Sequence, residues 1–470
     1  MLSRRLIFLL FTIVIAAPFY QCGQPMPPTG GSRDTLPPLL VKAIPADSGL
    51  NVKTNKITLE FNEYIQLQGV QQQMVISPIP TIMPLVESKL KQVTIKLKDT
   101  LEANTTYTIN FGESLQDVNE SNPMKNFTYI FSTGGVIDSG KLTGRVLMAE
   151  SGKADSTIIV VLQRDLSDSA FEKVKPRYFT RINKEGFFTF RYLANGRYNV
   201  YALKDADGSM KYDQVSEIIG FMDKPVDITA STEPASLYAF LETPEIPRRP
   251  TTSTPVKQPG VKEDKRYRYA GNLDNGSLDI LGDLVLKFDR KPSSYDTGKI
   301  SLVNDKLQRV TPYTLAFDSN ALHIKHAWIP GAKYSLLVEK DFAQDSLGNK
   351  ILRNDTLRFE TKKLSDYGSV SLRIINLDTT LNPVLLLYRS DELKNSIPLN
   401  SSRIPIPSIL PGEYEIRILF DKNRNRKWDT GNFKERKQPE LVKPRKEKLT
   451  IRANWDNEVD INLQEVQNQG

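Results

Sequence analysis

The chain has 470 residues, of which 39% are hydrophobic and 25% charged, proportions that are typical of globular proteins. Its net charge of +8 is mild for such a length, which argues against a nucleic-acid-binding protein. The single cysteine, Cys22, excludes disulfides within the chain, so each domain must be held together by its own core. The length suggests about three or four domains.

The N-terminus has the pattern of a secretory signal. Arg4 and Arg5 precede an uncharged apolar run at 6–17 that is too short to span a bilayer comfortably. Cys22 follows shortly afterwards, and the pattern resembles a lipobox, in which the signal (here residues 1–21) is removed and the cysteine is acylated. The resemblance implies a lipoprotein held to a membrane by several acyl chains on Cys22. The alternative is an ordinary signal peptide followed by an unrelated cysteine.

Two segments of biased composition divide the rest of the chain. Residues 22–37 are rich in Pro and Gly and predict a solvated tether, and residues 243–263 are rich in Pro, Thr and charge and predict a linker. Elsewhere, apolar and polar residues alternate in short runs, as at 56–61, 92–97 and 107–111, with turn-forming residues between them. This pattern is typical of half-buried strands in antiparallel sandwiches, so we expect an all-β fold.

The two halves of the chain repeat each other. In the first half Phe61, Tyr107, Asp117 and Phe131 are separated by 46, 10 and 14 residues. The corresponding intervals in the second half are 46, 11 and 14, between these residues: Phe288, Tyr334, Asp345 and Phe359. Further on, a Gly-x-Tyr sequence and two aspartates recur with unchanged spacing at 196–213 and 412–429. We therefore predict a duplication, with tandem domains named here A1 (38–134), B1 (135–242), A2 (264–363) and B2 (364–465).

Local motifs relate these domains to known families. A1 resembles the bacterial Ig-like domain of the S-layer type, through motifs at these positions: 44–46, 57–63, 104–111, 117–119 and 127–133. A2 is a weaker match. B1 resembles the transthyretin-like, carboxypeptidase-regulatory-like sandwich through 140–146 and 186–198, and B2 keeps only 410–414 of that pattern. Together with the tether, these motifs resemble Gram-negative Ig-like lipoproteins, which implies a structural or interaction role at the cell envelope and no catalysis.

One loop of B1 carries a pattern of oxygen-bearing side chains. Positions 1, 3, 5 and 9 of the run 205–213 are the following residues: Asp205, Asp207, Ser209 and Asp213. Calcium is bound by six to eight oxygens, so this loop is a candidate calcium site and calcium the only cofactor candidate. Position 12 is Ser216 rather than the glutamate of an EF-hand. The alternative is a turn whose side chains bond the local backbone, and the repeat at 421–429 adds basic residues that oppose a cation.

Asp followed by Ser or Thr, then by a small or apolar residue, recurs more often than composition predicts. The triplet resembles an O-glycosylation acceptor of Gram-negative envelope proteins, with these candidate residues: Thr35, Thr100, Ser156, Ser169, Ser346, Thr356 and Thr379. The alternative is that these pairs simply mark turns.

A strongly basic segment lies at 434–448. A solvated loop or a charge-protected edge strand is the expected structure, and contact with phosphate-bearing lipids or glycans is the alternative.

No motif for nucleophilic catalysis or phosphate binding is present in the sequence. We expect a non-catalytic, lipid-anchored rod of serial domains that acts as a structural or accessory subunit at the outer membrane, within a larger outer-membrane complex. The expected partners are the membrane, through the lipid, and an outer-membrane protein, with no nucleic acid. A glycan-binding or adhesion lipoprotein is the first alternative, and an unrecognised hydrolase is the second. The sequence does not decide between the periplasmic face and the cell surface.

Overall fold

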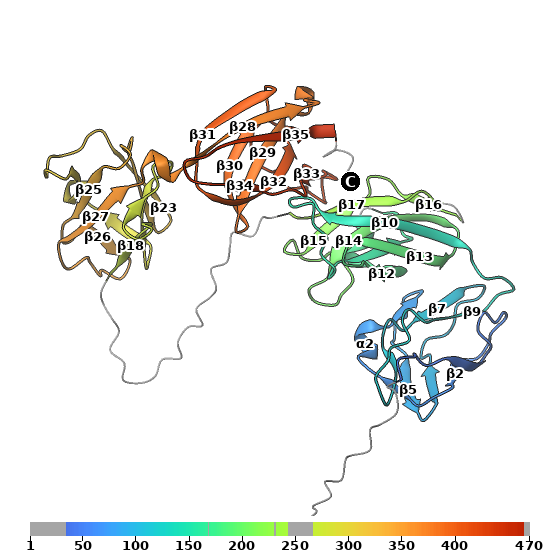
Figure 1. Cartoon of the computed structure of the whole chain (residues 1–470). Coiled ribbons are helices and arrows are strands. Elements are labelled where there is room, and N and C mark those ends of the chain that lie inside the picture. Colours follow the sequence, from blue (N-terminus) through green and yellow to red (C-terminus); the bar gives the residue numbers. More distant parts are fainter. Residues whose placement is uncertain (1–33, 168, 230–231, 243–266, 465–470) are drawn as a thin grey trace, which may run out of the picture.

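The computed structural model describes residues 34–167, 169–229, 232–242 and 267–464. The predicted signal peptide, Cys22, most of the tether and the 243–263 linker lie outside the described residues. The described chain is built almost entirely of strands arranged in successive sandwiches (Figure 1), which confirms the predicted all-β class with duplicated tandem domains. Alternation explains the strands: in the run 56–61, Ile57, Leu59 and Phe61 are buried and the residues between them are not.

A1 packs two antiparallel sheets and a two-stranded ribbon around one core. Its elements are β1 (Leu40–Ile44), β2 (Lys56–Phe61), β3 (Ile65–Leu67), α2 (Val70–Gln73), β4 (Val75–Ser77), β5 (Leu85–Lys89), β6 (Gln92–Lys96), β7 (Thr106–Asn110), β8 (Leu115–Asp117) and β9 (Thr128–Ser132). The sheet orders are β1-β2-β6-β5 and β4-β7-β9, and β3 pairs with β8.

A2 repeats this topology with one added strand, β19. Its elements are β18 (Tyr269–Gly271), β19 (Ser277–Leu278), β20 (Leu284–Phe288), β21 (Pro292–Tyr295), η2 (Thr297–Lys299), β22 (Ile300–Asn304), β23 (Thr314–Asp318), β24 (Ala321–Lys325), β25 (Lys333–Val338), β26 (Ala343–Asp345) and β27 (Asp355–Thr361). The orders are β18-β20-β24-β23 and β19-β27-β25-β22, and β21 pairs with β26.

B1 has a second kind of sandwich, in which the first and last strands pair in parallel. Its elements are β10 (Gly140–Met148), β11 (Ile159–Gln163), α3 (Ala170–Lys173), β12 (Tyr178–Arg181), β13 (Phe187–Leu193), β14 (Gly196–Lys204), β15 (Ile218–Phe221), β16 (Val226–Ile228) and β17 (Ala235–Leu241). Strand β10 lies between β13 and the parallel β17, and the other layer follows the order β12-β11-β14-β15.

B2 repeats B1. Its elements are η3 (Leu364–Asp366), β28 (Gly368–Ile375), η4 (Thr379–Leu381), β29 (Pro383–Arg389), β30 (Glu392–Pro398), β31 (Arg403–Ile409), β32 (Gly412–Phe420), β33 (Val442–Pro444), β34 (Leu449–Ile451) and β35 (Asp456–Asn462). Strand β28 lies between β31 and the parallel β35, and the other layer has the order β30-β29-β32-β33.

The domains touch in the order A1–B1–B2–A2, which differs from their order in the sequence (Figure 1). Glu102 of A1 forms a bidentate ion pair with Arg177 of B1, with a shortest distance of 2.8 Å. On the other side, the hydroxyl of Tyr367 in B2 donates to Asp279 of A2 at 2.6 Å. The expected rod of domains in serial order is therefore wrong, because B2 packs on B1 although A2 separates them in the sequence.

One aromatic residue of B2 joins the B1 core. Phe433, which is 3% exposed, lies in the segment between β32 and β33 and belongs to the same buried cluster as B1 residues. Its ring makes edge contacts at centroid distances of 5.3–6.4 Å with four aromatic residues of B1: Phe171, Tyr201, Tyr212 and Phe221. Burying such a side chain stabilises the contact by about 1.5–3 kcal/mol, so B1 and B2 form one packed body.

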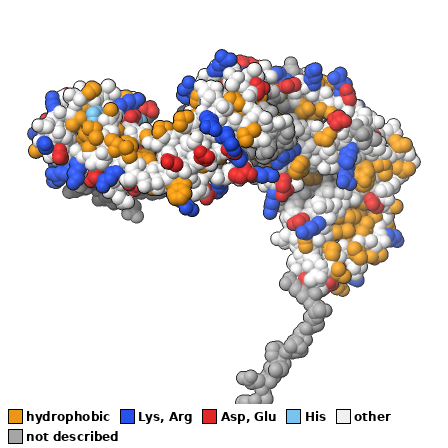
Figure 2. Space-filling view, turned by 45° about the horizontal axis from the view of Figure 1, so that its top comes forward, with side chains coloured by type: hydrophobic (Ala, Val, Ile, Leu, Met, Phe, Trp, Pro, Cys, Tyr) orange, Lys and Arg blue, Asp and Glu red, His pale blue; other side chains and the backbone are white. Residues whose placement is uncertain are grey.

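The backbone of the same segment also lies close to B1. A Cβ atom at Gly431 would lie 2.5 Å from the ring of Phe240 and 2.7 Å from the carbonyl oxygen of Lys437, so only glycine fits there. The side-chain amide of Gln438 donates to the Phe221 carbonyl at 3.0 Å. The prediction of a solvated loop or charge-protected edge strand at 434–448 therefore holds only in part. Strand β33 does lie at the edge of its layer, but Gln438 and the backbone N–H of Val442 both bond B1. Over the visible face, basic and acidic side chains are interspersed (Figure 2).

Candidate functional site

The acidic loop of B1 connects β14 to β15 and is shaped by Asp205. The Asp205 carboxylate accepts hydrogen bonds from the backbone N–H of Gly208 at 3.0 Å and of Met210 at 3.1 Å. Both of these residues have positive φ angles, 82° and 57°, which curl the backbone around the carboxylate. Such bonds between a side chain and the local backbone are typical of turns, which were the alternative to calcium binding at this position.

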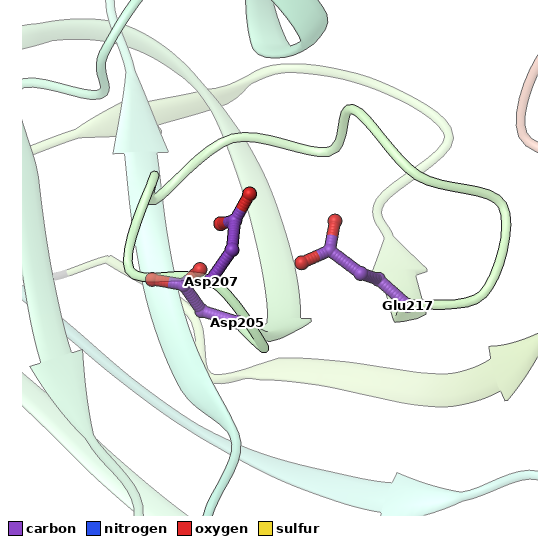
Figure 3. A group of neighbouring side chains, drawn as sticks. All are labelled: Asp205, Asp207 and Glu217. Atoms are coloured by element: carbon purple, nitrogen blue, oxygen red, sulfur yellow. The ribbon is translucent and has the colours of Figure 1, made fainter.

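The same loop gathers three carboxylates. Asp205, Asp207 and Glu217 each offer an oxygen, and these oxygens all lie within 4.8 Å of one another. Figure 3 shows the Glu217 side chain directed toward the two aspartates, from the opposite side of the loop. Glu217 is 1% exposed, whereas Asp207 is exposed, so the group runs from the surface into the domain.

The two oxygens of Glu217 have different surroundings. Oε1 accepts a hydrogen bond from the backbone N–H of Ala206 at 3.1 Å. Oε2 is buried and has no hydrogen-bond partner among the described residues. A buried polar oxygen without a partner is uncommon in proteins and requires an explanation.

Burial and like charge act together on this group. Burial raises the pKa of Glu217, and the charges of Asp207 and Asp213 raise it further. Burial also raises the pKa of Asp205, and neighbouring Asp207 adds to the effect. The nearby Lys204 ammonium pairs with Asp155 at 2.9 Å. The loop therefore holds several carboxylates close together, and a bound hard cation would reduce the repulsion between them.

The structure brings together two of the four residues predicted for calcium. Asp205 and Asp207 belong to the group, whereas the Ser209 hydroxyl bonds the backbone of Lys211 and Asp213 is exposed outside it. Sequence reasoning missed Glu217, which lies one residue beyond the EF-hand position that was considered, Ser216. Glu217 is the last residue before β15, and a search for acidic residues at that strand boundary would have found it.

The repeat of this loop in B2 is closed by amides. Asp421 accepts from the backbone N–H groups of Arg424 and Arg426, both at 2.7 Å, which reproduces the bonds of Asp205. The side-chain amides of Asn423 and Asn425 both donate to Asp429, at 2.6 and 2.7 Å. The B2 loop thus satisfies its own carboxylates.

The other predicted positions are mainly at the surface. Among the candidate glycosylation residues, Ser169 is partly buried. The other six are exposed: Thr35, Thr100, Ser156, Ser346, Thr356 and Thr379. In several triplets the aspartate bonds the local backbone, as Asp155 does with Thr157 N–H at 3.0 Å and Asp378 with Thr380 N–H at 2.9 Å. Glycosylation remains a prediction, and Cys22 lies outside the described residues.

No helix in the described part of the chain combines the length and apolar character needed to cross a membrane.

Comparison with protein families bears on A1. Residues 34–133 match the family described as "Bacterial Ig-like domain". The match covers well under half of the chain, and it confirms the Ig-like resemblance of the first domain. No curated protein matches the sequence.

The solved structures that the chain matches include two proteins from Bacillus species and a biofilm-associated protein. The Bacillus anthracis TIE protein is 12% identical, with 93% of this chain and 76% of that chain covered, and a TM-score of 0.17. BcpA, the major pilin subunit of Bacillus cereus, is 10% identical, with 69% and 98% covered and a TM-score of 0.18. The BSP domain of a biofilm-associated protein is 11% identical, with 86% and 96% covered and a TM-score of 0.16. Scores this low carry no argument about fold or function.

Proposed function

We propose that this protein is a non-catalytic, lipid-anchored envelope protein that acts as a structural or interaction subunit at the outer membrane. The Ig-like match of A1 supports a structural or adhesive role rather than catalysis. The observation that carries the proposal is the insertion of Phe433 into B1, which joins the two B domains and leaves an A domain on each side (Figure 1). Such a body places A1 and A2 on different sides, so each A domain can contact a different partner surface, which suits an accessory subunit.

The anchor in this proposal is lipid on Cys22. In the sequence A1 is the domain nearest to Cys22, so the lipid would bring A1 to the membrane first. A2 follows on the other side of the joined B1–B2 body and would be presented to a partner. Several acyl chains anchor a protein stably, without any membrane-spanning segment.

Affinity purification from detergent-solubilised membranes tests this function. We expect the tagged full chain to fractionate with membranes and to co-purify in stoichiometric amounts with an outer-membrane protein. The Cys22→Ser variant should leave the membrane fraction. A protein that is isolated alone and retained on polysaccharide would contradict the subunit role and favour the adhesion alternative. A Cys22→Ser variant that stays fully membrane-bound would contradict the anchor.

A further inference from the structure

We propose that Asp205, Asp207 and Glu217 form a calcium site in B1, and that the bound ion fixes the loop against which Phe433 of B2 packs. This inference does not depend on the lipid anchor or on an outer-membrane partner. It rests on the spacing of the carboxylates, on a buried oxygen that no described residue bonds, and on the contrast with the B2 loop.

The spacing of the three carboxylates suits one ion. Calcium–oxygen bonds are about 2.3–2.6 Å long, so ligands on opposite sides of the ion lie roughly 5 Å apart. The oxygens of Asp205, Asp207 and Glu217 are within 4.8 Å of one another, so all three can contact the same ion. Carboxylates can bind in a bidentate manner, and water can complete the shell on the exposed side near Asp207.

The second observation is the Oε2 atom of Glu217. It is buried, it has no hydrogen-bond partner among the described residues, and the side chain points toward the two aspartates (Figure 3). An isolated buried carboxylate oxygen is costly, and like charges nearby make it more so. A cation between the three groups removes both costs, because it supplies a partner for Oε2 and cancels the repulsion.

The third observation is that the corresponding loop of B2 supplies its own hydrogen-bond donors. Glu440 corresponds to Glu217, because one of its oxygens accepts from Lys422 N–H at 2.6 Å as Glu217 accepts from Ala206 N–H. Its other oxygen accepts from Asp429 N–H at 3.2 Å, so both oxygens have partners. Asn423 stands in the place of Asp207, and its amide donates within the loop. B2 therefore has hydrogen-bond donors, the Asn423 amide and the Asp429 N–H, in its loop. At the corresponding positions B1 has the Asp207 carboxylate and a Glu217 oxygen that no described residue bonds.

The ion would act on the interface because the loop also carries Tyr212. Tyr212 is 3% exposed, and its ring lies 5.3 Å from that of Phe433. Its hydroxyl donates to Glu242, which also accepts from the backbone N–H of Phe433. Fixing the two ends of the loop, at Asp205 and Glu217, therefore fixes the surface that receives B2.

Calcium is favoured over magnesium by the form of the site. The ligands come from an irregular loop and from a strand end rather than from a rigid octahedral cage, and calcium tolerates such variable geometry. A cavity of about 560 Å³ lies beside the site and is lined by Asp205, Glu217 and Trp428 among others, so Trp428 of B2 borders the same space as two of the carboxylates.

Calorimetric titration of the purified, EDTA-treated full chain with calcium chloride tests the site. We expect one ion per chain, with an affinity in the range of about 10⁻⁵–10⁻³ M and weaker binding of magnesium. Glu217→Gln should weaken calcium binding by about tenfold or more, whereas the matched change in B2, Glu440→Gln, should not. Asp207→Asn changes an exposed side chain and should give the same loss in a folded protein.

Absence of calcium binding at millimolar concentration, or equal binding by the wild type and the Asp207→Asn variant, would overturn the site. The fluorescence of Trp428 measures the coupling to B2 separately from calcium binding. Calcium should change the Trp428 emission, and Trp428→Phe should remove that change. Calcium binding that leaves the emission of Trp428 unchanged would overturn the coupling.

Discussion

At the scale of single residues, two buried aspartates close the equivalent loops of A1 and A2. Asp117 is 2% exposed and accepts from the backbone N–H groups of Glu120, Ser121 and Asn122 at 2.6–3.0 Å. Asp345 does the same in A2 with the N–H groups of Leu347 and Asn349. Each of them ends a strand of the two-stranded ribbon and precedes the last strand of its domain, so the bonds hold the connection from the ribbon to that strand.

Protonation of Asp117 should destabilise A1. Burial by itself raises the pKa of Asp117, but the hydrogen bonds donated by backbone N–H groups outweigh burial and lower the pKa below the ordinary value of an aspartate. A lowered pKa in the folded state means that the stabilisation is fully present above about pH 4 and is lost as the pH falls through the folded pKa. Acid should therefore weaken A1 through this group.

The variant Asp117→Asn tests this role. We expect a loss of about 1–3 kcal/mol at neutral pH, since an amide can satisfy fewer of the buried N–H donors. The dependence of the melting temperature on pH, between about 6 and 3, should also be shallower than in the wild type. The exposed Asp305→Asn serves as the control. Identical acid limbs for the wild type and Asp117→Asn would refute the role.

The roles of single residues could be predicted from the sequence only where their partners are close in the chain. The turn role of Asp117 could be predicted, because Asp, Asn and Gly between two strands act on backbone groups only a few residues away. Glu217 could not be assigned in the same way, because its partners become apparent only when the loop closes and brings positions 205 and 217 together.

At the scale of elements, alternation predicted the strands well. The runs at 56–61, 92–97 and 107–111 correspond to β2 at Lys56–Phe61, β6 at Gln92–Lys96 and β7 at Thr106–Asn110. The segment with Phe433 carries no such period. Its basic composition indicates a solvated surface, and only the neighbouring B1 domain gives its single phenylalanine a buried place.

Phe433 should therefore account for much of the B1–B2 contact. Phe433→Ala is expected to cost about 3–5 kcal/mol, because it leaves a cavity among the aromatic residues of B1. The matched control is Phe187→Ala, a phenylalanine of B1 that is 53% exposed, for which we expect a change within about 0.5 kcal/mol. Denaturation with urea measures both. Equal effects of the two substitutions would be inconsistent with an inserted Phe433.

At the scale of the whole molecule, the order of contacts was not predictable. Consecutive units are usually neighbours in space, and this rule led to the expectation of a serial rod. The interface forms instead where the longer loop of B2 packs on B1, against the corresponding B1 loop at Tyr212 and against neighbouring elements. The two loops differ in length. Asp213 and Glu217 of B1 are four positions apart, whereas Asp429 and Glu440 of B2 are eleven positions apart, and Phe433 lies in this longer stretch.

A cut within the linker tests the joined B1–B2 body most directly. A protease site is placed in 243–263, the purified chain is cleaved, and the products are separated by size-exclusion chromatography at about 10 μM. We predict that the two halves elute together as one particle, because the aromatic contacts of Phe433 hold them without a covalent link. Phe433→Asp should make them elute separately after the same cleavage. Wild-type halves that separate on cleavage would contradict the proposed architecture.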